Sequence, residues 1–327
     1  MLEKVEMRNF QTLNRAYNAV FRPGRLSVGL VVPLDPHGHD PVPDLTRHIE
    51  RAQLADSLGF SALWLRDVPF NVPSFGDAGQ VFDPFVYLGA LSMATRNIAL
   101  GVASMVLPLR HPAHVAKAAA SADALSGGRL LLGIASGDRP DEYPALNMSF
   151  PDRGARFRDS VDYIRAMAES YPRIETAQGI LTGGIDMLPK PTAGGLPLLI
   201  TGSSQQSAEW VARNGDGWMT YPRDAAAQGL VVADYRRRIA EAGLPDKPVM
   251  QSLYVDLVEQ PDAPPRPIHL GFQSGTVFLK RYLAELRDLG INHVALNLRF
   301  SGADIDDTMH RLAEALLPEF SNAEEQS

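Results

Sequence analysis

Cysteine is absent from the 327 residues of this chain. Its absence excludes disulfides, thiolate metal sites, iron–sulfur clusters and cysteine nucleophiles, and it fits a reducing compartment. A Lys/Arg-rich run is also missing: 31 Lys and Arg residues stand against 38 Asp and Glu, for a formal net charge of -7. An acidic chain without a basic patch is not expected to bind nucleic acid or an anionic membrane. The expected partner is therefore a small molecule.

Long apolar runs are missing as well. No stretch approaches the roughly 18 apolar residues of a membrane-spanning helix, and the first 17 residues lack the apolar core of a signal peptide. These absences predict a cytoplasmic protein with no membrane segment. What is present is a globular composition, 45% hydrophobic and 8% aromatic, which can bury a large core as one barrel or as two smaller domains.

Apolar segments typical of strands alternate with segments typical of helices. Strands are expected at 26–32, 60–66, 98–107, 129–136, 196–202, 217–222, 249–257 and 292–298. Helices are expected at 44–59, from 83 onward, at 112–125, near 153–170, over 203–215, and after each of the last three strands to about residue 320. Gly59 is a typical helix C-cap, and Asp83 followed by Pro84 is a typical helix start.

Eight such units favour an α/β fold, a single closed (β/α)8 TIM barrel, over an open doubly wound sheet. The segment VGLVVPLDPHGHD after the first strand has no G-x-G-x-x-G fingerprint of a dinucleotide-binding sheet. Residues 174–196 are too long and too rich in Gly and Pro for a plain connection, so we expect an insertion there, with a hairpin over the barrel mouth. The expected division is an N-terminal extension at 1–25 and one barrel at 26–327.

Polar and glycine-rich residues follow several of these strands, and the carboxyl ends of the strands form the functional mouth of a barrel. The residues expected at this mouth are Arg66, Asp67, Arg110, His111, Ser136, Gly137, Asp138, Arg139, Thr201, Gly202, Ser203, Ser204 and Arg223. Four of them are arginines. A face with this much positive charge predicts an anionic ligand.

The segment TRNIALGVASMVLPLRHPAHVAKAAASADALSGGRLLLGIASGDRPDE at 95–142 resembles the centre of the bacterial luciferase-like flavin-dependent oxidoreductases. The shared features are a strand ending in LP-x-x-HP, a helix, SGGR, and a strand ending in glycine. The resemblance continues through 197–223, and the WLRDVPF and FGDAG segments resemble an uncharacterised luciferase-type branch. It implies a barrel, FMN or a deazaflavin coenzyme as cofactor, and a homodimer or higher homo-oligomer.

The resemblance also implies cofactor-binding residues. Ala103 and Ser104 match a non-prolyl cis peptide beneath the flavin ring in the family. The helix start that holds the flavin phosphate matches Gly202, Ser203 and Ser204, with Thr201 just before them. Ser136 and Gly137 follow strand four near the cofactor, and Arg139 or Arg223 can supply charge for the phosphate. Luciferases carry a cysteine and an arginine after strand four, whereas this chain has Ala135 and Ser136, which argues against light emission.

The catalytic candidates are Arg66, Arg110 and His111, on the substrate side of the ring. His111 is a candidate proton donor and, with equal weight, a cap of the next helix. The pair His111 and His114 is not expected to bind a metal, because Pro112 lies between them and no other ligand has a fixed spacing. Asp67 and Asp138 are expected in ion pairs that shape the mouth. Trp64 and Trp218 are expected in the barrel core.

These features predict a flavin-dependent oxidoreductase, a monooxygenase that uses reduced FMN and oxygen on a small organic substrate. The electrons are expected from bound NAD(P)H or from a partner flavin reductase. Three alternatives stay open: a deazaflavin-dependent hydride-transfer enzyme, a flavin-binding barrel without turnover, and a barrel aldolase or isomerase acting on a phosphorylated substrate. An aldolase needs a lysine within a strand, and Lys117, Lys190, Lys247 and Lys280 are all expected in helices or loops.

Overall fold

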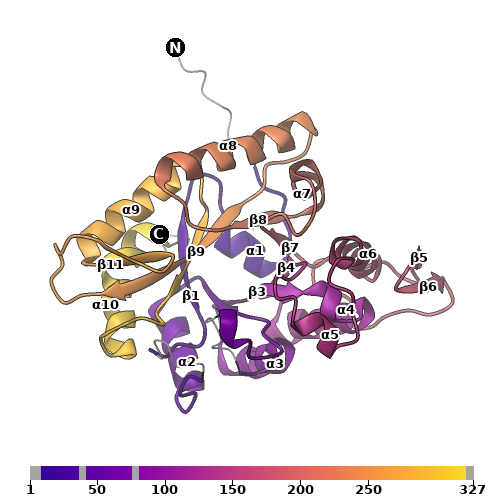
Figure 1. Cartoon of the computed structure of the whole chain (residues 1–327), viewed down its shortest axis with the longest axis horizontal. Coiled ribbons are helices and arrows are strands. Elements are labelled where there is room, and N and C mark those ends of the chain that lie inside the picture. The colour runs from indigo at the N-terminus through magenta and orange to yellow at the C-terminus, as the bar shows by residue number, and fades with distance from the viewer. Residues whose placement is uncertain (1–8, 37–41, 76–80, 322–327) are drawn as a thin grey trace.

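The computed structural model describes residues 9–36, 42–75 and 81–321. Its centre is a closed barrel of parallel strands surrounded by helices, as expected (Figure 1). The barrel strands are β1 (Ser27–Val31), β2 (Ala62–Leu65), β3 (Ala99–Val106), β4 (Leu130–Ala135), β7 (Leu198–Thr201), β8 (Gly217–Thr220), β9 (Val249–Leu257) and β12 (His293–Asn297). The barrel closes because β1 pairs in parallel with both β2 and β12.

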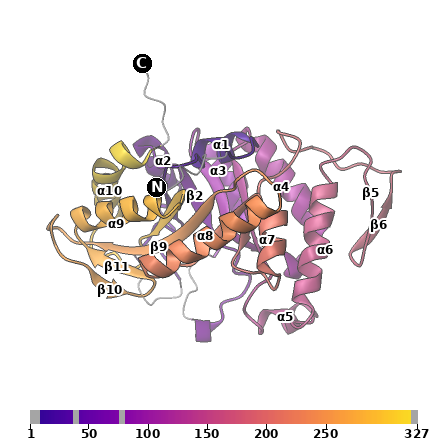
Figure 2. The ribbon, with the colours of Figure 1, turned by 90° about the horizontal axis from the view of Figure 1, so that it is seen from above.

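The helices form an outer ring around the strands (Figure 1). The ring contains α2 (His48–Leu58), α3 (Pro84–Ala94), α4 (Pro112–Ser126), α6 (Arg153–Ala166), α7 (Ala208–Asn214), α8 (Ala225–Glu241), α9 (Thr276–Asp288) and α10 (Ile305–Phe320). The view from above shows α9, α8, α7 and α6 along one side of the barrel (Figure 2). Short helices at the mouth are η1 (Pro73–Phe75), η2 (Leu107–Leu109) and α5 (Glu142–Ala145). None of the helices in the described ranges combines the length and the hydropathy needed to cross a membrane.

Local sequence sets the ends of several helices. Gly59 ends α2 in the left-handed conformation, with φ of 89°, as its predicted cap role requires. The side chain of Asp83 accepts hydrogen bonds from the amides of Phe85 and Val86, so α3 begins where it was expected. Helix α2 begins at His48 rather than at the predicted Asp44, because the Asp44 carboxylate accepts from the amide and the hydroxyl of Thr46 in a local turn.

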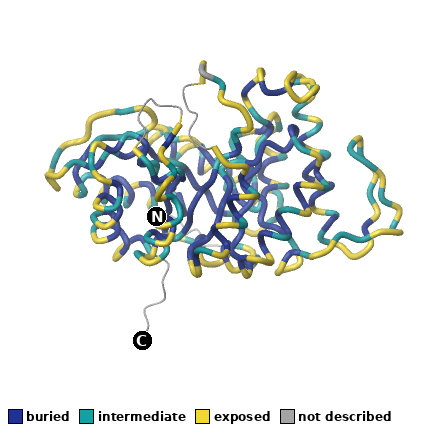
Figure 3. The backbone as a smooth tube through the Cα atoms, turned by 90° about the horizontal axis from the view of Figure 1, so that it is seen from below, coloured by how far each residue is buried: buried dark blue, intermediate teal, exposed yellow. Residues whose placement is uncertain are grey.

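Side chains from alternate strand positions fill the inside of the barrel, and the barrel strands are mostly buried (Figure 3). The interior cluster includes Trp64, Leu131, Leu199, Met219 and Met250. Glycines make room for its large members. A Cβ on Gly101 would lie 2.3 Å from the Trp64 ring, and one on Gly133 would lie 2.5 Å from the Met219 sulfur. Trp64 is in the core as predicted. Trp218 is also packed against the hydrophobic core, but on the helix side of β8, where its ring contacts that of Tyr235 in α8.

Helix α1 (Arg15–Val20) closes the amino end of the barrel. Tyr17, Val20 and Phe21 are buried and belong to the interior cluster. The Tyr17 hydroxyl donates to the carbonyl of Asp216, just before β8, at 2.7 Å. The described part of the expected N-terminal extension therefore covers the amino end of the barrel.

The expected insertion after α6 contains an antiparallel hairpin of β5 (Arg173–Thr176) and β6 (Gly179–Thr182). Its predicted place over the mouth is wrong: the hairpin lies at the outer side of α6 (Figures 1 and 2). It lies there because Ile174 and Leu181 pack against the core beneath the outer helices. A second hairpin, β10 (Arg266–Ile268) and β11 (Gly271–Ser274), was not predicted; β11 extends the sheet beside the end of β9.

Candidate active site at the barrel mouth

The carboxyl ends of β3, β4 and β7 carry small residues at the mouth. These are Ala103, Ser104, Ala135 and Thr201. Ala103 packs on the interior cluster, and Ala135 occupies the same alternating positions of β4 as Leu131. All four are only partly buried, and their side chains end in methyl or hydroxyl groups; we call this set the floor of small residues.

Two predicted residues from distant parts of the sequence meet at this floor. The hydroxyl of Ser104 is hydrogen-bonded to that of Thr201, 97 positions along the chain. Thr201 Oγ1 lies 3.3 Å from the thioether sulfur of Met219, which therefore supports the pair from below. The peptide bond between Ala103 and Ser104 is cis, as the sequence predicts. The residues predicted beneath a flavin ring are thus brought together, and their binding role stays a prediction.

The chain after β7 does not enter a helix at once. The prediction that a helix begins at Gly202-Ser203-Ser204 is wrong, because α7 begins at Ala208 with Ser207 as its N-cap. Gly202, Ser204 and Gln205 have φ values of 56°, 46° and 62°, which a right-handed helix does not allow. Ser204 is buried and its hydroxyl donates to the Thr201 carbonyl at 2.8 Å. Ser203 is exposed in this turn.

The turn at 202–206 packs on the start of α6, which brings an arginine beside it. The Gln206 side-chain amide donates to the Gly154 carbonyl at 2.8 Å. The next residue back, Arg153, stacks its guanidinium 3.7 Å from the centre of the Phe150 ring. Its Nε is buried and has no hydrogen-bond partner in the described part of the chain. Arg153 was not predicted as a site residue. The sequence feature that could have indicated it is its position after Asp152, at the start of a predicted helix.

Arg110 is held by two carboxylates. Its guanidinium donates to Asp67 at 2.8 and 3.2 Å and to Asp83 at 2.9 Å. The side chain of Asp67 is 1% exposed and also accepts from the Val106 amide at 3.0 Å. Burial disfavours the charge of Arg110, but the two carboxylates outweigh burial and raise its pKa. The predicted Asp67 ion pair exists, and it links the ends of β2 and β3 to the start of α3.

His111 has the cap geometry that was one of its two predicted roles. Its Nδ1 accepts from the Ala113 amide at 3.2 Å, so Nε2 carries the proton and donates to the Gln178 carbonyl at 3.0 Å. Both ring nitrogens therefore serve the start of α4 and the tip of the β5–β6 hairpin. Its ring meets that of His114 edge to face, and no group of three or more His, Asp or Glu residues in the described ranges could hold a metal ion.

The segment after β4 is packed rather than open. The Ser136 carbonyl accepts from the Tyr143 hydroxyl, and a Cβ on Gly137 would lie 2.6 Å from Val106. Arg139 is buried beside Glu142, with 3.8 Å between its Nη1 and the carboxylate. Glu142 was not predicted from the sequence.

Two further predicted arginines flank the mouth. Arg223 donates to the Thr220 hydroxyl at 2.6 Å and to the Tyr221 carbonyl at 2.9 Å, which ties it to the end of β8. Arg66 directly follows β2, on the same alternating positions as Trp64. Arg66 therefore lies on the side of β2 that faces the barrel interior. This distinguishes it from Arg110 and His111, the other two predicted catalytic residues.

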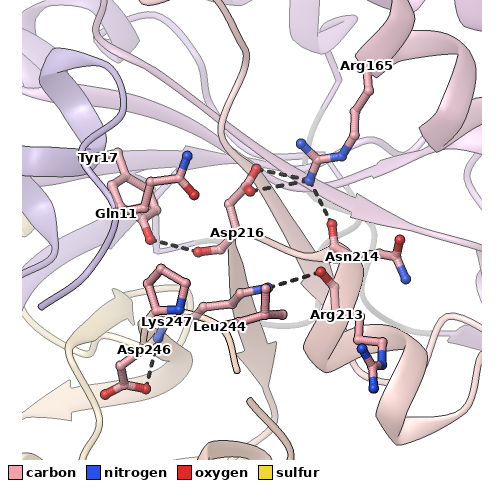
Figure 4. Close-up of a pocket in the computed structure, with 10 residues that line it drawn as sticks. Gln11, Tyr17, Arg165, Arg213, Asn214, Asp216, Leu244, Asp246 and Lys247 are labelled. Atoms are coloured by element: carbon pink, nitrogen blue, oxygen red, sulfur yellow. Dashed lines mark hydrogen bonds and ion pairs between the residues drawn. The ribbon is translucent and has the colours of Figure 1, made fainter. Parts of the chain in front are cut away.

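A pocket of about 210 Å³ lies at the opposite, amino end of the barrel (Figure 4). Within it Arg165 donates to Asp216, and Lys247 Nζ donates to the carbonyls of Ala212 and Gly215 at 2.7 Å each. Burial lowers the pKa of Lys247 to about 8. These bonds satisfy the last carbonyls around the end of α7, so this pocket has a structural explanation.

The sequence is similar to proteins of actinobacteria. An uncharacterised protein of Mycobacterium tuberculosis is 31% identical over 189 residues, 53% of this chain and 67% of the relative. The 4-hydroxyprotoasukamycin monooxygenase of Streptomyces nodosus is 30% identical over 181 residues, 54% of this chain and 47% of the relative.

Solved structures share the fold. A monooxygenase from Streptomyces bottropensis superposes with a TM-score of 0.77 at 22% identity, over 90% of this chain and 100% of that chain. An F420-dependent secondary alcohol dehydrogenase gives 0.73 at 18% identity, over 89% and 98%. The oxygenating constituent of a 3,6-diketocamphane monooxygenase of Pseudomonas putida, in complex with FMN, gives 0.70 at 15% identity, over 90% and 99%. At these identities the similarity shows the fold alone.

The family profile described as luciferase-like monooxygenase matches residues 25–263, from the start of β1 to the end of β9 and beyond it. The match includes every strand end that forms the floor of small residues and the turn at 202–206. This chain therefore belongs to the luciferase-like monooxygenase family.

Proposed function

We propose that this chain is an FMN-dependent monooxygenase that acts on a small organic substrate. The observation that carries the proposal is the floor of small residues on β3, β4 and β7, where the hydroxyls of Ser104 and Thr201 meet. Such a floor fits a planar ring with polar edges. Membership of the luciferase-like monooxygenase family supports the same cofactor class.

The residues around the floor also fit the phosphate of FMN. Among the described atoms outside its own chain neighbours, only the Tyr221 ring, at 3.8 Å, comes within 4 Å of a Cβ built on Gly202. The backbone there is open to a ligand. Ser203 adds an exposed hydroxyl, and Arg153 adds a positive charge near the turn; its buried Nε has no hydrogen-bond partner among the described residues. Together they would hold an anion by charge-assisted hydrogen bonds, with Arg139 and Arg223 on neighbouring strand ends.

Reduced flavin, when bound, supplies two electrons and so allows oxygen to be inserted into the substrate. The protein residues have other tasks. Ser104 and Thr201 orient the ring, and Arg66 faces the substrate and attracts its polar groups. Arg110 and Asp67 fix the ends of β2 and β3, so that Arg66 keeps its place. His111 would donate a proton to the substrate only after its ring had broken its hydrogen bonds with the Ala113 amide and the Gln178 carbonyl.

A second candidate is hydride transfer with the deazaflavin coenzyme F420. It is supported by the F420-dependent secondary alcohol dehydrogenase, whose fold this chain shares. The floor of small residues suits the ring of either cofactor. We further propose NAD(P)H or a partner flavin reductase as the source of electrons for FMN, and a homodimer as the working form.

The cofactor is tested by incubating the purified protein with FMN or F420, desalting it, and recording its visible spectrum. Retention of FMN is the expected result, whereas retention of F420 alone favours hydride transfer. Oxygen uptake with reduced FMN that rises on addition of a substrate identifies the monooxygenase. Flavin retention with neither oxygen uptake nor substrate turnover points to a binding protein, and no retention of either cofactor overturns the proposal.

A further inference from the structure

Glu142 is a buried carboxylate that lacks full hydrogen bonding. It is the first residue of α5, in the segment after β4, and it is 2% exposed. Its Oε1 has no hydrogen-bond partner among the residues that the structure describes. Arg139 Nη1 lies 3.8 Å from this oxygen, which is an ion pair beyond hydrogen-bond length. A fold that needed Glu142 only for packing would gain stability from a neutral side chain here.

The groups around Glu142 work against its ionisation. Its pKa is raised to about 6, mainly by burial; Arg139 and the Phe70 amide oppose the rise, and the charges of Asp67 and Asp138 add to it. The ionised form therefore costs folding stability near neutral pH. Buried charges that destabilise the fold in this way are typical of functional sites, where binding or catalysis requires the charged residue.

Arg139 connects Glu142 to the other side of the mouth. Its guanidinium lies 5.0 Å from the centre of the Phe75 ring, in η1. This ring belongs to the segment after β2, which begins with Arg66 and Asp67. The pair of Glu142 and Arg139 thus joins the segment after β4 to the segment after β2, and the candidate substrate residue Arg66 lies at the base of that second segment.

We propose that Glu142 is a positioning residue, which holds Arg139 between these two segments and thereby keeps the mouth in the shape that binds the cofactor. The identity of that cofactor rests on the proposed function. The role of Glu142 differs from that of a packing residue in one measurable respect: its charge costs stability in the free protein and favours binding in the complex.

The first test is the stability of the free protein. Glu142→Gln is compared with Asp141→Asn, a matched removal of one exposed negative charge at the preceding position. The charge of Asp141 is not among those that shift the pKa of Glu142. Because the folded pKa of Glu142 exceeds its ordinary value, the cost of its charge is absent below pH of about 4.5 and complete above about 7. Thermal unfolding should show Glu142→Gln more stable than wild type by a few degrees at about pH 8. The gain should disappear near pH 4.5, and Asp141→Asn should match wild type at both pH values.

The second test is binding, measured by flavin fluorescence at about pH 8 with FMN and with riboflavin. Glu142→Gln should weaken the affinity for both ligands by about tenfold, because the shape of the mouth is lost rather than a phosphate contact. Asp141→Asn should stay within about twofold of wild type. Arg139→Lys, which keeps the charge but not the fork-shaped geometry, should resemble Glu142→Gln in binding and provides a second variant if that protein folds poorly.

Two results would overturn the inference. One is a Glu142→Gln protein that is less stable than wild type at both pH values, which marks a packing residue. The other is unchanged flavin affinity in both Glu142→Gln and Arg139→Lys. If wild type itself binds neither FMN nor F420, the proposed function and the binding role fall together. The pH-dependent stability gain would still show that the charge of Glu142 is costly in the fold.

Discussion

At the residue scale, the mouth shows how a buried carboxylate fixes the role of an arginine. Asp67 is almost completely buried and depends on Arg110 for its charge partner. The position of Arg110 after a strand end predicts a substrate contact, but its geometry assigns it to the scaffold. A role in turnover would come through the shape of the mouth.

Arg110→Ala should therefore lower the free energy of unfolding by about 3–5 kcal/mol, because it leaves Asp67 buried without its partner. Arg237→Ala is the control, since Arg237 is half exposed in pairs with Asp234 and Glu241 and should cost less than about 1 kcal/mol. Urea unfolding measures both. Equal stability of the two variants would contradict the scaffold role of Arg110.

His293 is another residue whose surroundings set its charge. It is fully buried inside the barrel, where Nε2 accepts from the Trp64 indole at 2.8 Å and Nδ1 donates to Ser27 Oγ at 2.7 Å. Burial lowers its pKa to about 3. The folded protein therefore keeps His293 neutral, while the unfolded chain takes up a proton below its ordinary pKa of about 6.5.

The contribution of neutral His293 to stability should therefore be fully present above pH of about 6.5, and the free energy of unfolding should fall as the pH drops toward 3. His293→Gln should have lower stability at neutral pH and a flatter decline on acidification. His310→Gln, on the exposed side of α10, should keep the steep wild-type decline. Urea unfolding between about pH 7.5 and 4.5 distinguishes them; parallel curves for wild type and His293→Gln would refute the explanation.

The turn after β7 gives a prediction that separates the phosphate from the ring. Ser203→Asp places a carboxylate at an exposed position of the turn, while Ser203→Asn is nearly the same shape without charge. At about pH 8 the Asp variant should bind FMN roughly tenfold or more weakly than the Asn variant, through charge repulsion, and bind riboflavin equally well. Equal FMN affinities would remove the turn from the proposed site.

At the element scale, β4 depends on having no side chain at Gly133. A Cβ there would lie 2.2 Å from the Val102 carbonyl of β3 and 2.5 Å from Met219. Gly133→Ala should cost about 3 kcal/mol or more, because backbone on one side cannot move away. Gly89→Ala in α3, where a Cβ meets nothing within 4 Å in the described structure, should be neutral or stabilise by up to about 1 kcal/mol. Thermal unfolding compares them, and a stable Gly133→Ala protein would show that β3 and β4 can separate.

The elements that the sequence predicts well are those set by local chemistry. Apolar runs mark the barrel strands, Gly59 ends α2, and Asp83 with Pro84 begins α3. The turn at 202–206 could not be predicted in this way, because Gly-Ser-Ser is equally typical of a helix start. What decides it is tertiary: Ser204 bonds back to Thr201 and Gln206 bonds to Gly154.

The candidate site follows the same division. That Ser104 and Thr201 share a floor follows from the order of the strand ends in a barrel, which the alternation of strands and helices predicts. Arg153 and Glu142 were missed because they lie on helices beyond the strand ends. Each stands out in the structure because it has a buried polar atom with no hydrogen-bond partner in the described ranges, and no sequence pattern reveals such an atom. Conversely, the position of Arg110 just after a strand end is typical of a ligand-binding residue, but its pairs with Asp67 and Asp83 are those of a structural residue.

At the scale of the whole molecule, α3 presents an apolar outer face. Val86 and Met93, two turns apart, are 73% and 77% exposed. We predict that this face forms the interface of the proposed homodimer. Val86→Glu combined with Met93→Lys should yield monomers in sedimentation experiments, while Leu230→Glu, on the equally exposed position of α8, should not. A dimer that survives the double substitution would place the interface elsewhere.

Closure of the barrel through β1 and β12 has a consequence for how the chain is made. Ser27 and His293, which face each other across that closure, lie 266 positions apart. Until the ribosome has delivered β12, β1 and β9 each keep one edge with unpaired amides and carbonyls, the kind of edge that recruits strands from other chains. The finished molecule has no such edge in its barrel, but the nascent molecule has two for most of its synthesis. Protection by chaperones is therefore needed longest by the strand that is made first.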